Sequence, residues 1–483
     1  MTQLTFGDRP MLIGGKLTFG NGAEWITSLN PSDETEIGRA PAGTAQDVAQ
    51  ATAAALAAQP AWAAMSIWER AAKLKAVAAS FRTRVDEIKH VEAADSGNTI
   101  GNLGNDLFKA SNHFEYFAGL ATEIKGDTVP GLSSGLHMTL REPYGVVGRI
   151  VPFNHPFMFA TANLAAPLVA GNTVVLKSPE TSPLSASIMA EACASLLPPG
   201  VVNLVSGYGL PVGDAIARHP MIRRIGFTGS IRTGLAIQRA AAETCVKHVS
   251  LELGGKNPLI IFPDADLEHA CTAAVAGMNF AWAGQSCGST SRILVHESLY
   301  QRAIDLIAAK VEAIKVGDAL DPASQMGPLN SKTHYDRVMK LVEIGKTEAR
   351  LITGGARPTG STFKHGYWLQ PTVFADVTAD MTIGQQEIFG PVMTLQKWSN
   401  KDDMLRLANS TEYGLTAAIF TKDIKAALET ARAVEAGVVC INGSRMHFVG
   451  MPFGGVKNSG LGGEEGLEEL LSYTQTKALH ISL

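Results

Sequence analysis

The sequence predicts an α/β protein with two large lobes and a small appendage. Strand and helix patterns alternate twice, from Gly145 to Leu253 and again from Pro258 to Val449, as in parallel, doubly wound sheets. At 483 residues the chain is also too long for one ordinary hydrophobic core. We find no internal repeat of fixed period, which argues against solenoids and propellers.

The elements are predicted in the following order. Residues 44–113 are rich in alanine with helical periodicity, and Ser66 followed by Glu69 has the spacing of a capping box that opens a helix. Apolar runs separated by Gly and Pro then mark the strands of the two lobes. The predicted strands are 146–151, 173–177, 201–206 and 225–228, then 259–262, 292–296 and 438–442, with helices after Pro156, over 183–197 and ending at Ala242.

The appendage is predicted from two weakly patterned segments. Between Gly119 and Met138 the helical pattern gives way to short alternating runs, which fits an excursion from the lobe better than a linker. Leu470 to Leu483 alternates apolar and polar residues like an extended strand with nothing after it to pair with. Such a terminal edge favours pairing with another subunit.

Bulk properties restrict the class of function. A net charge of -4 and a pI near 6.3 give no broad basic field, so nucleic acid and membrane surfaces are not expected partners. The five cysteines are an odd number with no C-x-x-C pair, which indicates neither a disulfide framework nor a metal site. The first 22 residues lack a signal-peptide pattern, and no run of about 18 apolar residues occurs, so we expect a cytoplasmic location.

Cys287 is the candidate nucleophile. It lies among small residues, G-Q-S-C-G at 284–288, between a helical pattern and the strand at 292–296, where a thiol could reach a cleft. An inert thiol is the alternative. The remaining cysteines lie in helix or strand patterns typical of buried, unreactive thiols: Cys193, Cys245, Cys271 and Cys440.

Glu252 and Asn154 are the other catalytic candidates. Glu252 ends an apolar strand and precedes two glycines, so a desolvated carboxylate there could have a raised pKa and act as a general base. A helix cap or an ion pair with Lys256 is the alternative. Asn154 lies between two prolines that fix its turn, so its amide could face a developing oxyanion, although an ordinary turn asparagine is commoner.

Two segments of the first lobe could bind a phosphate or ribose. The sequence F-T-G-S at 227–230, with Gly229 and Ser230, follows a strand and opens a helix, where backbone N–H groups and the helix dipole accept a pyrophosphate. It is not the G-x-G-x-x-G pattern, so its spacing alone is weak support. Lys177 and Glu180 end a strand of the same sheet, where ligands of open α/β sheets bind, and solvated loop charges are the alternative.

Taken together, these segments resemble the aldehyde dehydrogenase superfamily, from about Asn21 to the C-terminus. Seven blocks in the same order carry the resemblance and make a chance match untenable. They are P-F-N-H-P at 152–156, K-S-P-E at 177–180, F-T-G-S at 227–230, E-L-G-G-K at 252–256, G-Q-S-C at 284–287, E-I-F-G-P at 387–391 and P-F-G-G-V-K-N-S-G at 452–460.

The resemblance implies an NAD(P)-dependent oxidation of an aldehyde to its carboxylic acid. Cys287 would attack the carbonyl, and the Asn154 amide with the Cys287 N–H would hold the oxyanion. Glu252 would activate the water that hydrolyses the resulting thioester. Relatives that transfer the acyl group to CoA typically lack this glutamate, so its presence favours hydrolysis.

The resemblance also assigns the cofactor contacts. It places Lys177 and Glu180 near the adenine ribose, Ser230 near the pyrophosphate, and Glu387 with Phe389 at the nicotinamide. A carboxylate at Glu180 should bind ribose hydroxyls and repel a 2′-phosphate, which favours NAD, with NADP as the alternative.

The implied fold has three parts, and family analogy makes the protein a homodimer or homotetramer. We expect a Rossmann-like cofactor domain over 1–118 and 139–253, an α/β catalytic domain over 254–459, and a small β oligomerisation arm over 119–138 and 460–483. In relatives, the positions of Phe159 and Ala162 often line the substrate pocket, and the small Ala162 predicts a substrate larger than acetaldehyde, such as an aromatic aldehyde. Arg445, in the loop with His447 and Phe448, either pairs with a distal substrate carboxylate or makes a surface or interface salt bridge.

Three rival functions remain open on the sequence. A CoA-acylating dehydrogenase or reductase shares the fold, and Glu252 argues against it. A non-catalytic binding or structural protein on the same fold would be expected to have lost Cys287, Glu252 or Asn154, and all three are present. A cysteine hydrolase would need a histidine beside the thiol, and only His155 lies in a matched block.

Overall fold

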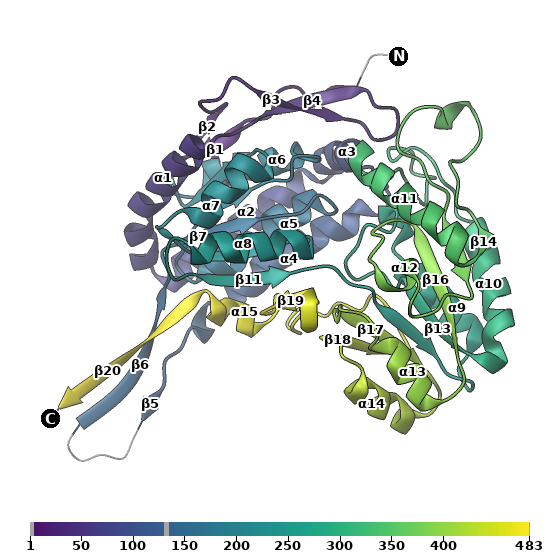
Figure 1. Cartoon of the computed structure of the whole chain (residues 1–483). Coiled ribbons are helices and arrows are strands. Elements are labelled where there is room, and N and C mark those ends of the chain that lie inside the picture. Colours follow the sequence, from purple (N-terminus) through teal and green to yellow (C-terminus); the bar gives the residue numbers. More distant parts are fainter. Residues whose placement is uncertain (1–3, 130–134, 483) are drawn as a thin grey trace.

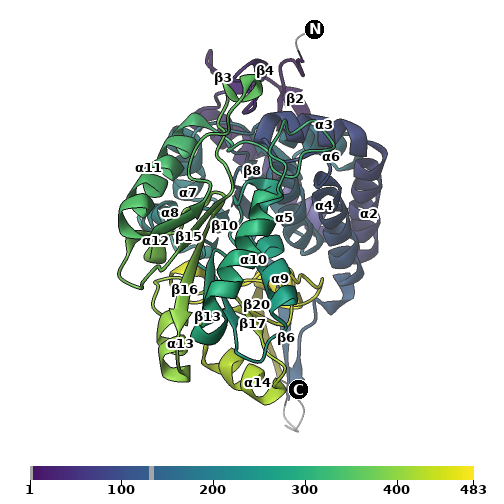
Figure 2. The ribbon, with the colours of Figure 1, turned by 90° about the vertical axis from the view of Figure 1, so that its right-hand side faces the viewer.

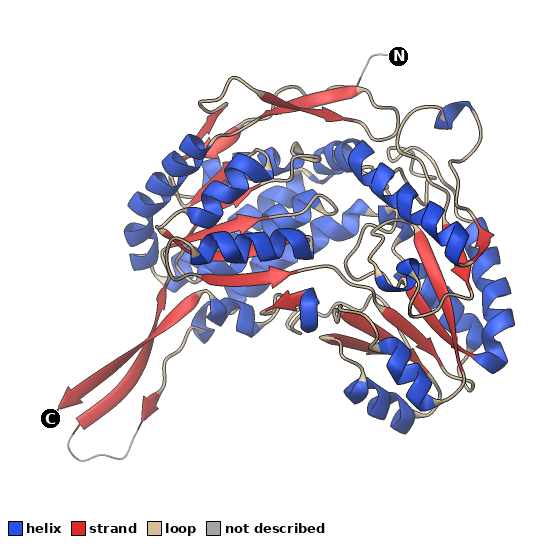
Figure 3. Ribbon diagram, in the orientation of Figure 1, coloured by secondary structure: helices blue, strands red, loops and turns tan. Residues whose placement is uncertain are grey.

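The computed structural model describes residues 4–129 and 135–482, which fold into two sheet-based lobes and a projecting arm (Figure 1). The predicted α/β class is confirmed. Sheets lie between layers of helices in both lobes (Figure 3), and no helix among the described residues is both long and apolar enough to cross a membrane.

The first lobe is built on an eight-stranded sheet. Five central strands are parallel, and the three outer strands, β19 on one edge and β1 and β2 on the other, are antiparallel to their neighbours. In spatial order the strands are β19 (Gly460–Leu461), β11 (His248–Glu252), β10 (Ile222–Thr228), β7 (Val146–Ile150), β8 (Thr173–Lys177), β9 (Val202–Val205), β1 (Met11–Ile13) and β2 (Lys16–Thr18).

Alternate side chains of these strands enter two separate cores, as the two-residue period of a strand requires. Val147 and Leu176 pack with α2 to α6, whereas Val146 and Val175 pack with α1, α7 and α8. Both faces of the sheet are therefore buried. The helices of this lobe are α1 (Ala45–Ala64), α2 (Ile67–Thr83), α3 (Val85–Ser96), α4 (Leu103–Gly119), α5 (Pro156–Val169), α6 (Ser185–Leu196), α7 (Asp214–Arg218), α8 (Ile231–Ala242) and α15 (Leu467–Ser472).

The second lobe is built on a seven-stranded sheet, seen from the side of α10 in Figure 2. Six strands are parallel, and only the edge strand β14 is antiparallel. The strands are β14 (Arg350–Thr353), β15 (Thr372–Ala375), β16 (Val392–Trp398), β13 (Arg292–His296), β12 (Pro258–Ile261), β17 (Thr416–Phe420) and β18 (Val438–Ile441). The helices are α9 (Leu267–Gly277), α10 (Tyr300–Glu312), α11 (Lys332–Glu348), α12 (Thr382–Gln385), α13 (Lys401–Ala408) and α14 (Ile424–Ala433).

The arm is a three-stranded antiparallel sheet that extends away from both lobes (Figure 1). Its strands are β20 (Thr474–Ser482), β6 (Gly135–Pro143) and β5 (Thr128–Val129), and β20 pairs with β6 along its whole length. Because β20 is an edge strand, one side of it has no partner strand among the described residues.

The sequence prediction for the arm needs two corrections. The predicted strand at 470–483 begins later, because Leu467 and Leu470 lie on one face of the short helix α15, where Leu470 is buried and α15 packs against α5. The expected arm segments, 119–138 and 460–483, also differ from the sheet: β6 continues to Pro143, and β19 belongs to the eight-stranded sheet. Residues 130–134 and Leu483 lie outside the described part of the chain.

Other local predictions are confirmed. Ser66 and Glu69 form the capping box at the start of α2, with each side chain bonded to the other residue's backbone N–H. The strands predicted at 173–177 and 292–296 agree with β8 and β13 residue for residue. The N-terminal strands were not predicted: β1 and β2 extend the large sheet, and β3 (Trp25–Leu29) pairs with β4 (Glu36–Pro41) in a separate ribbon.

Candidate active site

Cys287 lies in the loop that enters β13, at the amino end of the second sheet. Its carbonyl oxygen and that of Ser289 accept hydrogen bonds from Asn257 Nδ2, at 2.7 and 2.9 Å. At Gly255, a Cβ would lie 2.7 Å from the Cys287 carbonyl oxygen, so only glycine lets the two loops approach this closely. The half-buried thiol is thus held on a backbone fixed from both sides.

Glu252 ends β11, at the carboxyl edge of the first sheet. Its side chain is 4% exposed, and neither carboxylate oxygen has a hydrogen-bonding partner among the described residues. Burial, followed by the charges of Glu464 and Glu465, raises the pKa of this carboxyl well above its usual range. An unsatisfied buried carboxylate is costly, and its raised pKa suits a proton acceptor.

The alternative of an ion pair between Glu252 and Lys256 is wrong. Lys256 is 1% exposed, and its Nζ likewise has no partner among the described residues. Burial and the nearby Arg292 lower the pKa of Lys256 to about 7. Glu252 does not cap a helix either, because neither of its oxygens accepts a hydrogen bond.

Asn154 is in the turn between β7 and α5, and its side chain reaches the cysteine loop. Its Nδ2 donates to the Gln285 carbonyl oxygen at 3.0 Å, two residues before Cys287. One amide hydrogen satisfies this bond, and the second remains for another acceptor. Because the side chain is 3% exposed and bridges two loops, Asn154 is not an ordinary turn asparagine.

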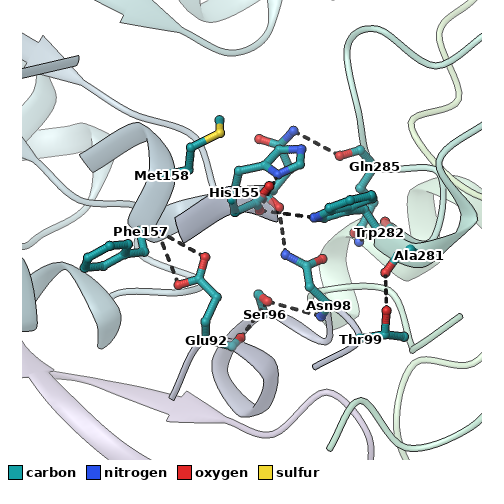
Figure 4. A network of polar contacts seen from close by, with 12 residues as sticks. Glu92, Ser96, Asn98, Thr99, His155, Phe157, Met158, Ala281, Trp282 and Gln285 are labelled. Carbon is teal, nitrogen blue, oxygen red and sulfur yellow. Dashed lines mark hydrogen bonds and ion pairs between the residues drawn. The ribbon is translucent and has the colours of Figure 1, made fainter. Parts of the chain in front are cut away.

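A network of polar contacts supports the turn that contains Asn154 (Figure 4). Asn98 Nδ2 donates to the Asn154 carbonyl oxygen at 2.8 Å, and the Phe157 N–H donates to the Glu92 carboxylate at 3.1 Å. His155 Nδ1 lies 2.7 Å from Asp106 Oδ2. The same Asp106 oxygen accepts from Trp282 Nε1 at 3.3 Å, so the network joins the turn to the segment before Cys287.

Two of the predicted cofactor residues lie at the carboxyl end of β8: Lys177 is its last residue, and Glu180 lies in the turn that follows. The Lys177 Nζ is 2.9 Å from Glu180 Oε2, and Lys177 is only 3% exposed, so the alternative of a solvated loop charge is wrong for Lys177. Burial lowers the pKa of Lys177. The Glu180 side chain remains 41% exposed and accessible to a ligand.

Gly229 and Ser230 end β10 and begin α8. The Gly229 N–H donates to the Glu252 carbonyl oxygen at 3.0 Å, so this amide is already satisfied. Ser230 is the N-cap of α8 and accepts from the Thr233 N–H at 3.3 Å. Gly229 therefore links the ends of two strands, and Ser230 lies at the positive end of a three-turn helix.

Glu387 and Phe389 approach the same junction from the second lobe. Glu387 Oε1 accepts from the Gly255 N–H at 2.9 Å, and burial raises the pKa of Glu387 to about 7. Phe389 has φ 55°, and its carbonyl oxygen lies 2.7 Å from His334 Nε2. Its ring is 5.9 Å from that of Phe153, beside Asn154. The structure thus brings Glu387 into contact with the glycine pair that follows Glu252.

Known proteins resemble this chain over nearly its whole length. The sequence profile of the aldehyde dehydrogenase family matches residues 19–479. The chain belongs to the aldehyde dehydrogenase family. It is 43% identical to the aldehyde dehydrogenase tropH of Talaromyces stipitatus, over 94% of this chain and 90% of that protein.

Two further relatives support the assignment. The hydroxyisobutyraldehyde dehydrogenase of Mycolicibacterium austroafricanum is 40% identical, over 98% of this chain and 94% of its own. The aldehyde dehydrogenase of Bacillus cereus, solved in complex with NAD+, is 36% identical and superposes with a TM-score of 0.95, covering 99% of this chain and 97% of that one. The predicted class is confirmed: the protein is an aldehyde dehydrogenase of the NAD(P)-dependent family.

A cysteine hydrolase is not supported by this site. No histidine among the described residues hydrogen-bonds the Cys287 thiol, and burial, followed by the charge of Glu252, raises its pKa well above the usual range. Burial also raises the pKa of Cys193 and of Cys271 to about 12, as expected of inert thiols in an aldehyde dehydrogenase core. Among the described residues, no group of three or more His, Cys, Asp or Glu side chains could hold a metal ion.

Several residues that build the dehydrogenase site were not found by sequence reasoning. Asn257 follows a matched block directly, yet nothing in its neighbours indicates that it binds the cysteine loop. Ser459 lies inside a matched block and donates to the Gly254 carbonyl oxygen at 2.7 Å. Its own carbonyl oxygen accepts from the Leu253 N–H at 2.8 Å, so it fixes the strand end that carries Glu252.

The loop before Pro452 contributes Arg445 beside Trp282. The Arg445 guanidinium lies 5.5 Å from the Trp282 ring and donates to the Ala276 carbonyl oxygen at 3.3 Å. Arg445 forms no salt bridge with any of the described residues. The predicted alternative of a surface salt bridge is therefore not observed within the chain. Phe448, in the same loop, is 76% exposed.

Proposed function

We propose that this aldehyde dehydrogenase oxidises its substrate through a covalent intermediate on Cys287. The Cys287 sulfur forms a bond to the aldehyde carbon as the carbonyl π bond breaks, so the carbonyl oxygen becomes an oxyanion and the thiol proton passes to water. The free hydrogen of the Asn154 amide and the Cys287 N–H stabilise that oxyanion. The observation that carries the proposal is the convergence of Cys287, Asn154 and the unpartnered Glu252 carboxylate at the junction of the two sheets.

Hydrolysis of the thioester is assigned to Glu252. The carboxylate takes a proton from water, the water oxygen attacks the thioester carbon, and the C–S bond breaks to release the acid. The proton held by Glu252 then passes to the departing sulfur and regenerates the Cys287 thiol. An acid with no hydrogen-bonding partner is free to take up this proton. A CoA-acylating enzyme would have no use for such a base.

We assign the cofactor to the carboxyl edge of the eight-stranded sheet, in agreement with the general rule for open α/β sheets. The residues there fit a dinucleotide, because two buried hydroxyls at the ends of β8 and β10, Ser178 Oγ and Thr228 Oγ1, have no hydrogen-bonding partner in the described part of the chain. Bound NAD supplies the hydride acceptor. Lys177 and Glu180 would hold the adenine ribose, and the exposed Glu180 carboxylate favours NAD over NADP.

The remaining cofactor contacts are assigned residue by residue. Ser230 and the first turn of α8 would hold the pyrophosphate, because the Gly229 N–H is already bonded to Glu252. Glu387 would bind the nicotinamide ribose, and Phe389 would position the ring. Lys256, buried close to Glu387, offsets the charge of that carboxylate.

The pocket assignments also stay proposals. We propose that Phe159 and Ala162 border the aldehyde, with Ala162 leaving room for a substrate larger than acetaldehyde. Arg445, which lies over Trp282 without an acid partner, is placed to meet a substrate group at the entrance. We also propose that the first lobe binds the cofactor, that the second lobe carries the catalytic Cys287, and that the arm of β5, β6 and β20 serves oligomerisation.

We propose that the protein is a homodimer or homotetramer. The unpaired side of β20 offers a strand edge to a second subunit. A groove of about 860 Å³ lies beside β11 and β19 and includes Leu461 and Val246, which are 53% and 93% exposed. Apolar side chains this exposed favour coverage by another subunit. The cytoplasmic location stays a prediction.

The decisive experiment measures the formation of NADH from NAD, or of NADPH from NADP, at 340 nm. The substrates are a panel of aliphatic, aromatic, hydroxylated and carboxylated aldehydes, with and without CoA. Turnover without CoA is expected, and Cys287→Ala should lower it at least about 10³-fold. Cys245→Ala, at a half-buried thiol outside the site, is the matched control and should turn over like the wild type. Activity only with CoA would overturn the role of Glu252, and silence with every aldehyde would favour a non-catalytic protein.

A further inference from the structure

A small, partly open cavity lies between α4, α5 and the segment that precedes α15. Its volume is about 20 Å³, enough for one water molecule or one hydroxyl group. Its walls combine apolar side chains, Phe159 and Ala162, with the polar side chains of His113, Asn163, Lys109 and Glu465. None of these polar side chains has a role in the proposed chemistry at Cys287.

Two of the polar side chains in this cavity lack partners. His113 is 4% exposed, and neither ring nitrogen has a hydrogen-bonding partner among the described residues. Asn163 is 5% exposed, and its Nδ2 has none either. Leaving a buried donor or acceptor unsatisfied is costly, so two such residues on one cavity point to a polar ligand group.

The charged groups of the cavity are already paired. Lys109 Nζ lies 2.5 Å from Glu465 Oε1, and Arg149 pairs with Glu464 at 2.9 Å. Burial lowers the pKa of His113 to about 4, so its imidazole is neutral near pH 7. A neutral imidazole has one donor and one acceptor nitrogen, which matches a hydroxyl group.

The third acid on the cavity wall, Glu469, does not alter this balance. Burial raises its pKa to about 8, so it is mostly protonated near pH 7. One of its oxygens accepts from the Glu465 N–H at 2.7 Å. Among the described residues that line it, the cavity thus has no unpaired cation for a carboxylate and no unpaired anion for an ammonium group.

The cavity lies along the helix that starts at the active-site turn. From Asn154 the chain passes through His155, whose ring is 5.8 Å from that of Phe159, and one helical turn further on come Ala162 and Asn163. Seven residues separate Pro156 from Asn163, which corresponds to about 10 Å along the axis of α5. In Figure 4, Met158, which also lines the cavity, lies on the side of His155 away from Trp282.

The charges of two residues that line the cavity shift the pKa values of the proposed catalytic groups, which agrees with a cavity close to the active site. The charge of Lys109 lowers the pKa of both Glu252 and Cys287, and that of Glu465 raises the pKa of Glu252. Both residues line the cavity, so it lies close to the reacting groups.

We propose that this cavity is a distal substrate subsite, in which His113 and Asn163 bind a neutral hydroxyl group at the end of the substrate remote from the aldehyde. The inference rests on the proposed function and narrows its substrate class to hydroxylated aldehydes. Asn163 Nδ2 donates to the hydroxyl oxygen, and the acceptor nitrogen of His113 receives the hydroxyl proton. Ala162 leaves the space that the substrate chain occupies.

The test measures kcat/KM for pairs of straight-chain aldehydes that differ only at the far end, a methyl against a hydroxyl group, over increasing chain length. Carboxylated and ammonium-bearing aldehydes of the same lengths complete the panel. The wild type should prefer the hydroxylated member about 10-fold or more at the length that reaches the cavity, because an analogue without the hydroxyl leaves the buried groups unsatisfied.

Two variants locate the preference. His113→Phe and Asn163→Leu should each reduce the ratio of hydroxylated to plain aldehyde about 3- to 10-fold, as the loss of one hydrogen bond predicts. Asn105→Leu, at an exposed position of α4 outside the cavity, is the matched control and should keep the wild-type ratio.

The outcomes separate this inference from the proposed function. Turnover of plain aldehydes with a ratio near one at every length would overturn the subsite and leave the dehydrogenase intact. A preference for the carboxylated or ammonium member would overturn the assignment of a neutral group. Equal ratios in wild type and both cavity variants would place the preference elsewhere, and no turnover of any aldehyde would overturn the proposed function itself.

Discussion

The contact between α3 and α5 and the junction between the two sheets each bury a glutamate, and the two are used differently. Glu92 is fully buried, yet it accepts hydrogen bonds from the Phe157 N–H at the start of α5. Glu252 is nearly as deeply buried, at 4% exposed against 0%, and accepts none from the described residues. Burial raises the pKa of both, to about 8 for Glu92.

The difference separates a structural acid from a reactive one. Glu92 satisfies a free N–H of a helix start, so it stabilises the helix that follows the Asn154 turn. For Glu252 no hydrogen bond from the described residues offsets the cost of burying the carboxylate, and an uncompensated carboxylate of this kind is typical of a functional site. Burial and a raised pKa alone would not have told the two apart.

The largest expected effect is on turnover. Glu252→Gln should lower the steady-state rate about 10²- to 10⁴-fold, because the thioester then lacks its general base. NADH should form in a single burst, measured by stopped-flow absorbance, and then stall. Glu92→Gln serves as the control and should keep turnover within a few-fold of the wild type. Equal steady-state rates for Glu252→Gln and the wild type would refute the contrast.

The next effect concerns two asparagines on the same turn. Asn154→Ala should lower kcat about 10²- to 10³-fold, as expected for the loss of one oxyanion donor. Asn98→Ala, which removes only the donor to the Asn154 carbonyl oxygen, should lower it much less. A larger loss of kcat in Asn98→Ala than in Asn154→Ala, measured by steady-state kinetics, would contradict the role of Asn154 as an oxyanion donor.

The third effect is on the pH dependence of kcat. The general base must be deprotonated, and the pKa of Glu252 lies well above 4.5, so the rate should fall about tenfold for each pH unit below that pKa. The residual rate of Glu252→Gln should no longer show this tenfold fall for each pH unit. A wild-type profile that stays flat from neutral pH down to about 5 would show that Glu252 is not the limiting base.

The smallest expected effect is on stability, with opposite signs at the two sites. Glu92→Leu leaves the Phe157 N–H unsatisfied and should lower the free energy of unfolding by about 1–3 kcal/mol. Glu252→Leu removes a buried polar group that has no partner and should raise the Tm while abolishing turnover. Thermal unfolding followed by circular dichroism measures both, and a lower Tm for Glu252→Leu would indicate a structural role.

Much of the fold could be predicted from local patterns. The parallel strands β8 and β13 are short apolar runs bounded by clear breaks, and both were placed correctly. The strands β1 and β19, of three and two residues, join the large sheet only through pairing with distant segments, β9 and β11. Such short strands carry too little periodicity to be recognised in the sequence.

The identities of Cys287, Glu252 and Asn154 as candidates were determined by the sequence, because each lies in a block whose order and residue types are specific to one family. The burial, the hydrogen bonding and the pKa of these side chains were decided by the tertiary structure. The side chain of Asn257 reaches Cys287 across thirty residues, and Ser459 reaches Gly254 across about two hundred. Whether Glu252 paired with Lys256 depended on where both side chains point, and neither orientation is encoded in their spacing. Desolvation and hydrogen bonding depend on atoms that only folding brings together, so the reactive acid could be named from the sequence but distinguished from Glu92 only in the folded chain.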